Sequence, residues 1–328
     1  MRVTIKSIAR DLGISHMTVS RALSGSKQVN PATRQKICDY AEQVGYVRSS
    51  AASAMRGDPT AIVGLLLPNI VNDFYARFAN ALSLMCAEAG FDLVIHLTGD
   101  DIAQEVQCLT RLQALQVRIV LRVPAPRREG QAPYPVNGPD LINLIRTVEG
   151  ETSRGDLMIH DDLAIRQAVA HLQSQGHSRI AYIGGAEALS SGRLRLRAFT
   201  RGLAENGLDI HDELVFTGSP GQRVGHECAL ALLDMDKGPD ALICGGFELS
   251  SGALNACLER SIALPEQLAF VGYGDPAFHQ WICGGVTTIA LSGDEVARCA
   301  MRMITGEDTS VAESGEGITA RFIVRRTA

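Results

Sequence analysis

The sequence predicts an N-terminal all-α helix-turn-helix module followed by an α/β body of two Rossmann-like lobes. Charge is the first observation behind this prediction, because residues 1–57 carry nine Lys and Arg but only three Asp and Glu. The whole chain of 328 residues has 31 basic and 36 acidic side chains, which leaves 22 and 33 for the remainder. The second observation is the alternation of strand-like and helix-like apolar patterns from about residue 59 onward.

The basic N-terminal segment suggests a nucleic-acid module on an acidic body, although charge alone fits a solvated basic face nearly as well. Its apolar spacing predicts three short helices. Thr4 can cap the first helix, which Gly13 ends. Ser15 can cap a second helix over residues 16–25, with Val19 facing inward. The third helix starts at Pro31 and runs to Gly45.

In a module of this kind the second helix enters the major groove of DNA, and its early residues meet base edges. Arg21 can donate two hydrogen bonds to a guanine, and Met17 can offer only an apolar contact, for instance to a thymine methyl. His16 is either a third base contact or an ordinary surface residue. Hydroxyl and amide groups suited to phosphate contacts are found at Thr4, Ser15, Thr18, Ser20, Ser24, Asn30 and Thr33.

The run VTIKSIARDLGISHMTVSRALSGSKQVNPATRQKICDYAEQVGYV closely resembles the N-terminal module of LacI/GalR-family bacterial transcription regulators. The resemblance implies a DNA-binding domain over residues 1–47 and a hinge helix or linker over 48–58. In the family this helix pairs with its dimer mate and wedges a leucine into the minor groove, which bends the DNA. Ala52 and Met55 occupy its DNA-contacting positions, with Met55 where leucine is usual, and Arg48 replaces the usual proline.

The body, residues 59–328, reads as buried strands that alternate with amphipathic helices. We expect a first lobe from about 59–156 plus 291–320, and a second from about 157–290 plus 321–328. The segment LINLIRTV, residues 141–148, fits a strand or a helix. Strands are predicted over 61–68, 91–97, 117–123, 157–160, 179–185, 240–246, 268–274, 286–291 and 321–326. A helix that ends at Gly90 is predicted from an apolar face of Phe78, Leu82, Met85 and Ala89, and a second helix from an apolar face of Ile102, Val106 and Leu109. Further helices are predicted over about 162–176, 194–207, 223–235, 248–260 and 295–305.

The resemblance extends through this body and implies a periplasmic-binding-protein-like fold that binds a small effector between its lobes. The family positions for effector contacts are Asn72, Asp73, Phe74, Arg193, Arg195, Phe247 and Asp275. Two departures change the pattern. Gly274-Asp275 replaces a pair of aspartates, and Gly246-Phe247, followed by Glu248, replaces Asn-Asp. Losing carboxylates while keeping arginine should make the cleft more positive and favour an anion.

The resemblance therefore implies a homodimeric repressor of transcription that binds a near-palindromic operator and responds to an effector. MTVSR is similar to regulators of the gluconate type, which together with the charge argument favours a sugar acid or a phosphorylated sugar. A neutral sugar held by Asp275, a nucleobase effector, and a solute-binding protein that does not bind DNA are the alternatives.

Composition excludes several other classes. No apolar run approaches the ~20 residues of a membrane span, and the N-terminus lacks the apolar core of a secretion signal. We therefore expect a cytoplasmic, nucleoid-associated protein with no membrane partner. Eight scattered cysteines without a CxxC are expected to be reduced packing residues. With neither GxGxxG nor GxxxxGK[ST], and no nucleophile–base pair or metal cluster, we expect no enzyme, cofactor or metal.

Overall fold

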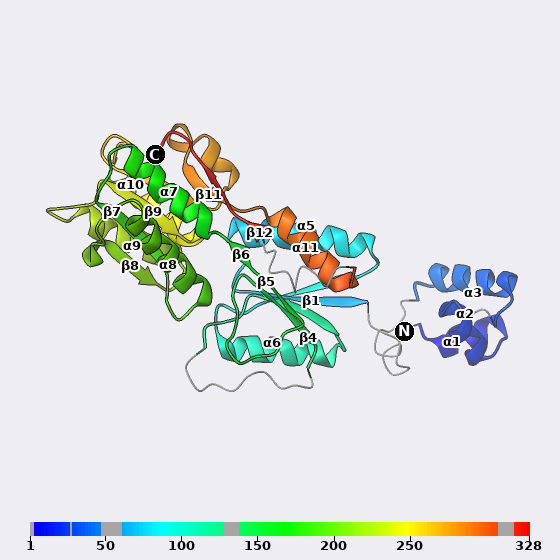
Figure 1. Cartoon of the computed structure of the whole chain (residues 1–328). Coiled ribbons are helices and arrows are strands. Elements are labelled where there is room, and N and C mark those ends of the chain that lie inside the picture. Colours follow the sequence, from blue (N-terminus) through cyan, green and yellow to red (C-terminus); the bar gives the residue numbers. More distant parts are fainter. Residues whose placement is uncertain (1–2, 27, 47–60, 128–137, 308–317) are drawn as a thin grey trace. The chain divides into compact units, whose positions relative to one another are not determined.

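The computed structural model describes residues 3–26, 28–46, 61–127, 138–307 and 318–328. The chain divides into two compact units, Met1–Thr60 and Ala61–Ala328, which are described separately below (Figure 1). The expected hinge helix, with Arg48, Ala52 and Met55, lies outside the described residues. None of the helices in the described ranges combines the length and the apolar character needed to cross a membrane.

The first unit consists of three helices, α1 (Ile5–Leu12), α2 (His16–Leu23) and α3 (Pro31–Gln43). Its small core is built around Ile8, Val19 and Ile37, each at most 1% exposed. Sequence-coded signals set the helix ends. Thr4, Ser15 and Asn30 are the N-caps, and Gly13 ends α1 with a φ of +67°, a conformation that glycine adopts without strain. The predicted helix-turn-helix is confirmed.

The second unit contains two lobes. The sheet of the first lobe is parallel, with the strand order β2-β1-β3-β4-β5. Its strands are β1 (Ile62–Leu67), β2 (Asp92–Leu97), β3 (Ile119–Arg122), β4 (Asp140–Leu144) and β5 (Gly155–Leu157). Helices α5 (Asp73–Glu88) and α11 (Gly293–Thr305) pack together on one face, and α6 (Ile102–Ala114) covers the other (Figure 1).

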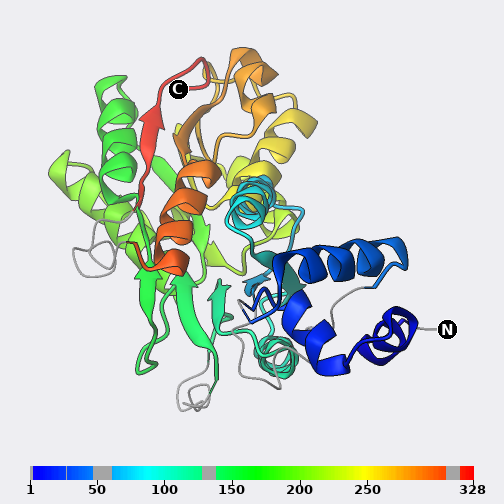
Figure 2. The same ribbon diagram turned by 90° about the vertical axis from the view of Figure 1, so that its right-hand side faces the viewer.

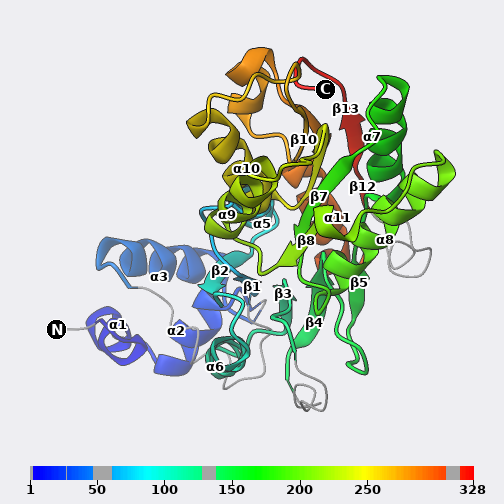
Figure 3. The ribbon, with the colours of Figure 1, turned by 90° about the vertical axis from the view of Figure 1, so that its left-hand side faces the viewer.

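The sheet of the second lobe has the order β13-β11-β10-β9-β7-β8 and is parallel except for β13. Its strands are β7 (Ile180–Gly185), β8 (Val215–Gly218), β9 (Ala241–Gly245), β10 (Ala269–Tyr273), β11 (Thr287–Ala290) and β13 (Arg321–Ile323). Figure 3 shows α7 (Asp162–Ser174) and α8 (Ser190–Glu205) on one face, and α9 (Gln222–Leu233) and α10 (Phe247–Glu259) on the other. Short 3-10 turns cover Asp212–Leu214, Ala277–Gln280 and Ile282–Gly284.

The chain passes between the lobes more than once. It leaves the first lobe through β6 (Ile159–His160), which pairs in parallel with β12 (Ile318–Thr319). It also returns from α11, in the first lobe, to β13, in the second, as the orange and red segments of Figure 2 show. Residues distant in sequence therefore build each lobe, and the carboxyl ends of the parallel strands of both sheets meet at the cleft between them.

The structure resolves one ambiguity of the sequence prediction and differs from it in several details. Residues 140–144 form a strand, which resolves the ambiguous LINLIRTV segment, and β8 was not predicted at all. Helix α8 starts at Ser190, four residues earlier than expected. On α6 the predicted apolar face is rotated, because Val106 is 44% exposed while Glu105 is buried. Glu105 is buried because it pairs with Arg122 of β3.

Candidate functional site

The outward face of α2 carries the side chains predicted to meet base edges. His16, Met17 and Arg21 are exposed, with Met17 at 52%, whereas Val19 and Ala22 on the opposite face are buried. An exposed methionine between two groups able to donate hydrogen bonds suits an apolar contact within a polar interface. No acidic residue occurs in α2, so nothing on this helix repels phosphate.

Several predicted phosphate contacts already stabilise helix ends. Thr4 Oγ1 accepts from the Ser7 amide at 3.2 Å, and Ser15 Oγ accepts from the Thr18 amide at 3.0 Å. Asn30 Oδ1 accepts from the Ala32 amide at 2.9 Å, and the Ser24 hydroxyl donates to the carbonyl of Arg21 at 3.1 Å. Thr18, Ser20 and Thr33 are half-buried. Thr4, Ser15 and Asn30 therefore fix the helix starts whether or not they also contact DNA.

A cavity of about 650 Å³, counting the part open to solvent, lies at the carboxyl ends of the strands of both sheets. Four of the predicted effector residues line it: Asn72, Phe74, Arg195 and Phe247. The remaining walls are largely apolar side chains and glycine backbone. Lining residues that the sequence reasoning did not assign are Tyr75, Ile145, Arg146, Ile159, Gly185, Leu189, Ser191, Gly192, Pro220, Gly245, Gly246, Glu248, Leu249, Tyr273, Gly274 and Leu291.

Arg195 belongs to a buried polar cluster at the base of this cavity. Its Nε donates to Asp161 Oδ2 at 2.5 Å, and its Nη1 donates to the carbonyl of Gly245 at 3.1 Å. The guanidinium lies 4.3 Å from the ring centroid of Tyr273, whose hydroxyl donates to the same Asp161 oxygen at 2.5 Å. Burial raises the pKa of Tyr273, and the neighbouring Asp161 carboxylate raises it further, so the phenol stays protonated.

The floor beside Arg195 consists of glycines packed over Tyr182. This side chain is fully buried, stacks on Phe199 with ring centroids 4.8 Å apart, and has no hydrogen-bond partner for its hydroxyl among the described residues. A Cβ at Gly184 or Gly245 would overlap the Tyr182 ring. A side chain at either position would therefore displace the Tyr182 ring, and at Gly245, which lines the cavity, the backbone stays uncovered.

The first-lobe wall contains a strained turn. Ile145 has a φ of +67°, and the Arg146 amide donates to the carbonyl of Leu144 at 2.6 Å, which closes a three-residue γ-turn of the rare hand. A β-branched residue seldom adopts this conformation. The turn places Ile145 and Arg146 in the cavity lining. The next amide, that of Thr147, donates across the cleft to Ser190 Oγ at 2.9 Å.

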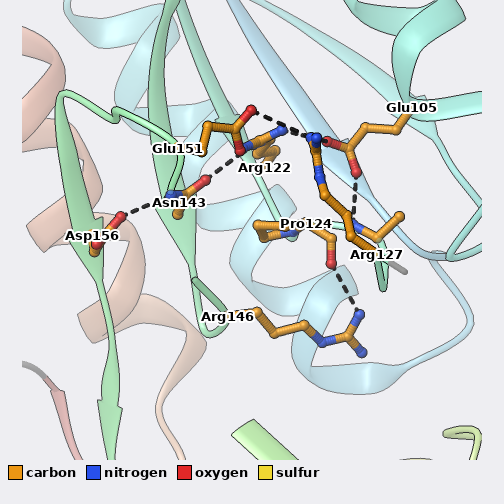
Figure 4. Close-up of polar contacts among 9 residues, drawn as sticks. Glu105, Arg122, Pro124, Arg127, Asn143, Arg146, Glu151 and Asp156 are labelled. Carbon is orange, nitrogen blue, oxygen red and sulfur yellow. Dashed lines mark hydrogen bonds and ion pairs between the residues drawn. The ribbon is translucent and has the colours of Figure 1, made fainter. Parts of the chain in front are cut away.

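Arg146 is held by acceptors of its own lobe. Its Nη1 donates to Asp100 Oδ1 at 2.5 Å and to the carbonyl of Pro124 at 3.3 Å. Figure 4 shows the contact between Arg146 and Pro124 and, in the same lobe, a second buried network around Arg122. Arg122 pairs with both Glu105 and Glu151, and its Nε donates to Asn143 Oδ1 at 3.0 Å. The wall is therefore anchored to the interior of the first lobe.

Glu248 supplies a carboxylate to the cavity from the first turn of α10. Its Oε1 accepts from Asn69 Nδ2, in the first lobe, at 3.2 Å. Burial raises its pKa, partly opposed by hydrogen bonds from Asn69 and Asn72. Because Arg195 and Arg146 each pair with a carboxylate and Glu248 adds another, the lining side chains lack the positive excess assumed from the sequence.

Three predicted effector residues lie outside this cavity. Arg193 donates to the carbonyl of Glu187 at 2.7 Å on the protein surface. Asp73 and Asp275 line a neighbouring cavity. Asp275 is held there by Arg325, whose Nη1 and Nη2 donate to its two oxygens at 2.7 and 2.8 Å. Within the described residues, no three His, Cys, Asp or Glu side chains are placed to share a metal ion.

Comparison with known proteins gives two family matches. Residues 4–49 match the description "Bacterial regulatory proteins, lacI family", and residues 169–328 match "Periplasmic binding protein-like domain". The chain is 25% identical to catabolite control protein A of Priestia megaterium, over 93% of this chain and 92% of that protein. It is also 25% identical to the regulator GalR of Escherichia coli, over 87% and 83% of the two chains.

Solved structures agree with these matches in fold. The lac repressor dimer bound to operator and the anti-inducer ONPF aligns with a TM-score of 0.79 at 17% identity, covering 100% of this chain and 99% of that one. A complex of the transcriptional regulator CelR with cellobiose aligns with a TM-score of 0.66 at 24% identity, over 100% of both chains. With its lacI-type helix-turn-helix module and its two-lobed, periplasmic-binding-protein-like body, the chain belongs to the LacI/GalR family of bacterial transcription regulators.

Proposed function

We propose that this regulator is a cytoplasmic, homodimeric repressor whose operator affinity is set by a small carbohydrate derivative bound between its lobes. The observation that carries the proposal is the pairing of an exposed, acid-free face on α2 with a ligand-sized cavity between the two sheets. Two copies of α2 would read successive half-sites of a near-palindromic operator. No catalytic step is part of this function.

On the DNA side, we assign base contacts to His16, Met17 and Arg21. Backbone contacts are assigned to Thr4, Ser15, Thr18, Ser20, Ser24, Asn30 and Thr33. The hinge positions Ala52 and Met55 would add minor-groove contacts. The test is selection of binding sites from randomised duplex DNA. Arg21→Ala should relax preference at one position of each half-site, at a cost of about 1–3 kcal/mol in discrimination. Arg10→Ala is the matched control, because Arg10 is an exposed arginine on α1. An unchanged consensus for Arg21→Ala would contradict this docking.

On the effector side, the ligand chemistry follows from the cavity lining. Helix α8 has no side-chain N-cap, and its first-turn residues Ser191 and Gly192 line the cavity, so its amides can receive an anionic oxygen. Glu248 and Asn72 can bind hydroxyl groups on another side. A sugar acid satisfies both sets, and the existence of a cellobiose complex of the similar regulator CelR supports a carbohydrate as the class of ligand.

The regulatory claim is tested by titrating ligands into the operator complex. A ligand that prefers one arrangement of the lobes should change operator affinity by the ratio of its affinities for the two arrangements. It should also stabilise the body by about 2.7 kcal/mol at one hundred times its dissociation constant. A ligand that stabilises the body but leaves operator affinity unchanged would contradict the regulatory role, though not the binding site.

A further inference from the structure

The two departures from the family pattern, at Gly274 and at Phe247, depend on one another in space. Gly274 has a φ of +83°, and a Cβ built there would lie 2.5 Å from Cδ2 of Phe247. A residue with a side chain at position 274 would therefore collide with the ring as well as strain the backbone. While the Phe247 ring keeps this position, a side chain at position 274 cannot be accommodated.

Phe247 also separates two cavities. Phe74, Phe247, Gly274 and Leu291 line both the cavity between the lobes and the neighbouring one, so they stand between the two. The neighbouring cavity is charged, with lining side chains Asp73, Arg77, Asp275, Asp294 and Arg321. Because of this wall, Asp275 lies on the far side of Phe247 from Arg195 and Glu248. The wall presents apolar surface, from Phe74 of one lobe and Phe247 of the other, to whatever occupies the inner cavity.

We propose that Phe247 is the specificity-determining residue of the effector cavity, and that it selects ring-closed sugar derivatives over open-chain ones. The proposal rests on the carbohydrate effector proposed above. A pyranose has a flat face of C–H groups and a rim of hydroxyls. The face can pack on an aromatic ring, while the rim reaches polar groups such as Glu248 and Asn72. An open-chain polyol has no such face, so against Phe247 it must leave hydroxyl groups without partners.

Glucuronate and gluconate form a suitable test pair, because both carry one carboxylate on a six-carbon chain and only glucuronate closes a pyranose ring. Isothermal titration calorimetry on the full chain should show glucuronate binding at least tenfold more tightly than gluconate. Phe247→Leu keeps apolar bulk but removes the flat ring, and it should bring the ratio close to one. Phe216→Leu, on β8 away from the cavity, is the control and should leave the ratio unchanged.

Each outcome of this experiment bears on the proposal. Equal or tighter binding of gluconate, a ratio unaffected by Phe247→Leu, or no measurable binding of either acid would overturn it. Glucose is included as a neutral ring. If glucose binds well and both acids bind weakly but measurably, with glucuronate still the tighter of the two, ring selection by Phe247 stands while the sugar-acid part of the proposed function fails. If a ligand binds with the expected preference but leaves operator affinity unchanged, the proposed regulatory function fails while ring selection by Phe247 stands.

The steric dependence is tested without ligand by a double-mutant cycle on thermal unfolding. Gly274→Ala should lower the melting temperature strongly in the wild-type background, since the new Cβ meets both the ring and the left-handed φ. In the Phe247→Ala background only the backbone strain remains, so the decrease should be clearly smaller. Additive effects of the two substitutions would show that ring and glycine are independent, and would overturn the proposed dependence.

Discussion

The two lobes share an architecture but differ in how completely their buried polar groups are paired. In the first lobe, Arg122 is paired with two glutamates and Arg146 with Asp100. In the second lobe Arg195 pairs with Asp161, but the Tyr182 hydroxyl and both ring nitrogens of His279 are buried with no hydrogen-bond partner among the described residues. The second lobe instead relies on close packing against bare glycine backbone at Gly184, Gly245 and Gly274.

This difference indicates separate tasks. The first-lobe wall is held by charges that constrain one another, so its shape should be insensitive to what fills the cavity. The second-lobe floor is shaped by the space that glycines leave, so small changes in side-chain volume should alter it directly. Substitutions that remove charge from the buried ion pairs of the first lobe, or that add volume or charge in the second lobe, therefore test this difference between the lobes.

The largest effect is expected in the first lobe. Arg122→Met leaves Glu105 and Glu151 buried without their main partner, with Arg127 as a remaining ion-pair partner of both. Removing one side of a buried ion pair typically costs about 3–5 kcal/mol. Urea unfolding followed by circular dichroism measures the loss. The control is Arg223→Ala, whose pair with Glu227 is exposed and should contribute less than about 1 kcal/mol. Similar losses of unfolding free energy for both variants would show that the buried network contributes no more to stability than the exposed pair.

The next effect depends on pH and lies in the second lobe. Burial lowers the pKa of His279 to about 4, and the nearby Arg325 lowers it too, against an opposing effect of Asp275. The unfolded state therefore binds the proton more tightly. Stability due to this residue is complete above about pH 6.5 and is lost as pH falls through 4, by at most about 3 kcal/mol.

His279→Leu should flatten the unfolding free energy between pH 6.5 and 4 relative to wild type. His211→Leu is the control, because His211 is a partly exposed histidine beside Glu213. If the acid sensitivity of the His279 variant equals that of wild type, then the unpartnered imidazole is not what distinguishes the second lobe.

A third, smaller effect concerns the volume left by glycine. Gly245→Ala places a methyl group against the ring of Tyr182, and overpacking of this kind typically costs about 1–3 kcal/mol. Gly221→Ala is the matched control, because Gly221 precedes α9 and its Cβ would meet nothing closer than 4.0 Å. Differential scanning calorimetry compares the two. Equal melting temperatures would mean that the floor repacks freely.

The smallest effect is expected at Glu248. Burial raises the pKa of this carboxyl, so the folded state binds the proton more tightly than the unfolded one. The native state therefore loses stability as pH rises through the folded pKa. Glu248→Gln, which keeps an acceptor for Asn69, should raise the melting temperature slightly at pH 7 and leave it unchanged at pH 4. A lower melting temperature at pH 7 would indicate that the charge itself is needed to hold the lobes together.

The sequence predicted the fold more fully than the site, for physical reasons. Apolar periodicity and capping residues such as Thr4 and Ser15 act locally, so the three N-terminal helices and most of the body could be read directly. The errors occur where tertiary contacts override local pattern. The rotated face of α6 depends on the pairing of Glu105 with Arg122, and the two residues are 17 positions apart.

At the site, the sequence indicated residues next to strand ends, such as Asn72, Phe74 and Phe247. It did not reveal which charges neutralise one another. Asp161 pairs with Arg195 across 34 positions, and Asp275 with Arg325 across 50, so neither pair is visible in local spacing. Asp161 does follow a short strand and precede a helix, which is a usable signal for a residue at the cleft. The steric dependence of Gly274 on Phe247 has no sequence signal in a single chain.

The hydrogen bonds that cross the cleft bear on how quickly ligands can exchange. One joins the Thr147 amide to Ser190, and others join Asn69 and Asn72 to Glu248. A neutral hydrogen bond of this kind is worth roughly 1 kcal/mol net, and one to a charged group roughly 1.5–3. Separating these contacts costs far less than unfolding either lobe. Opening by thermal fluctuation on the microsecond-to-millisecond scale of hinge motions would then admit and release small molecules. The occupancy of the cavity could therefore follow changes in ligand concentration with little delay.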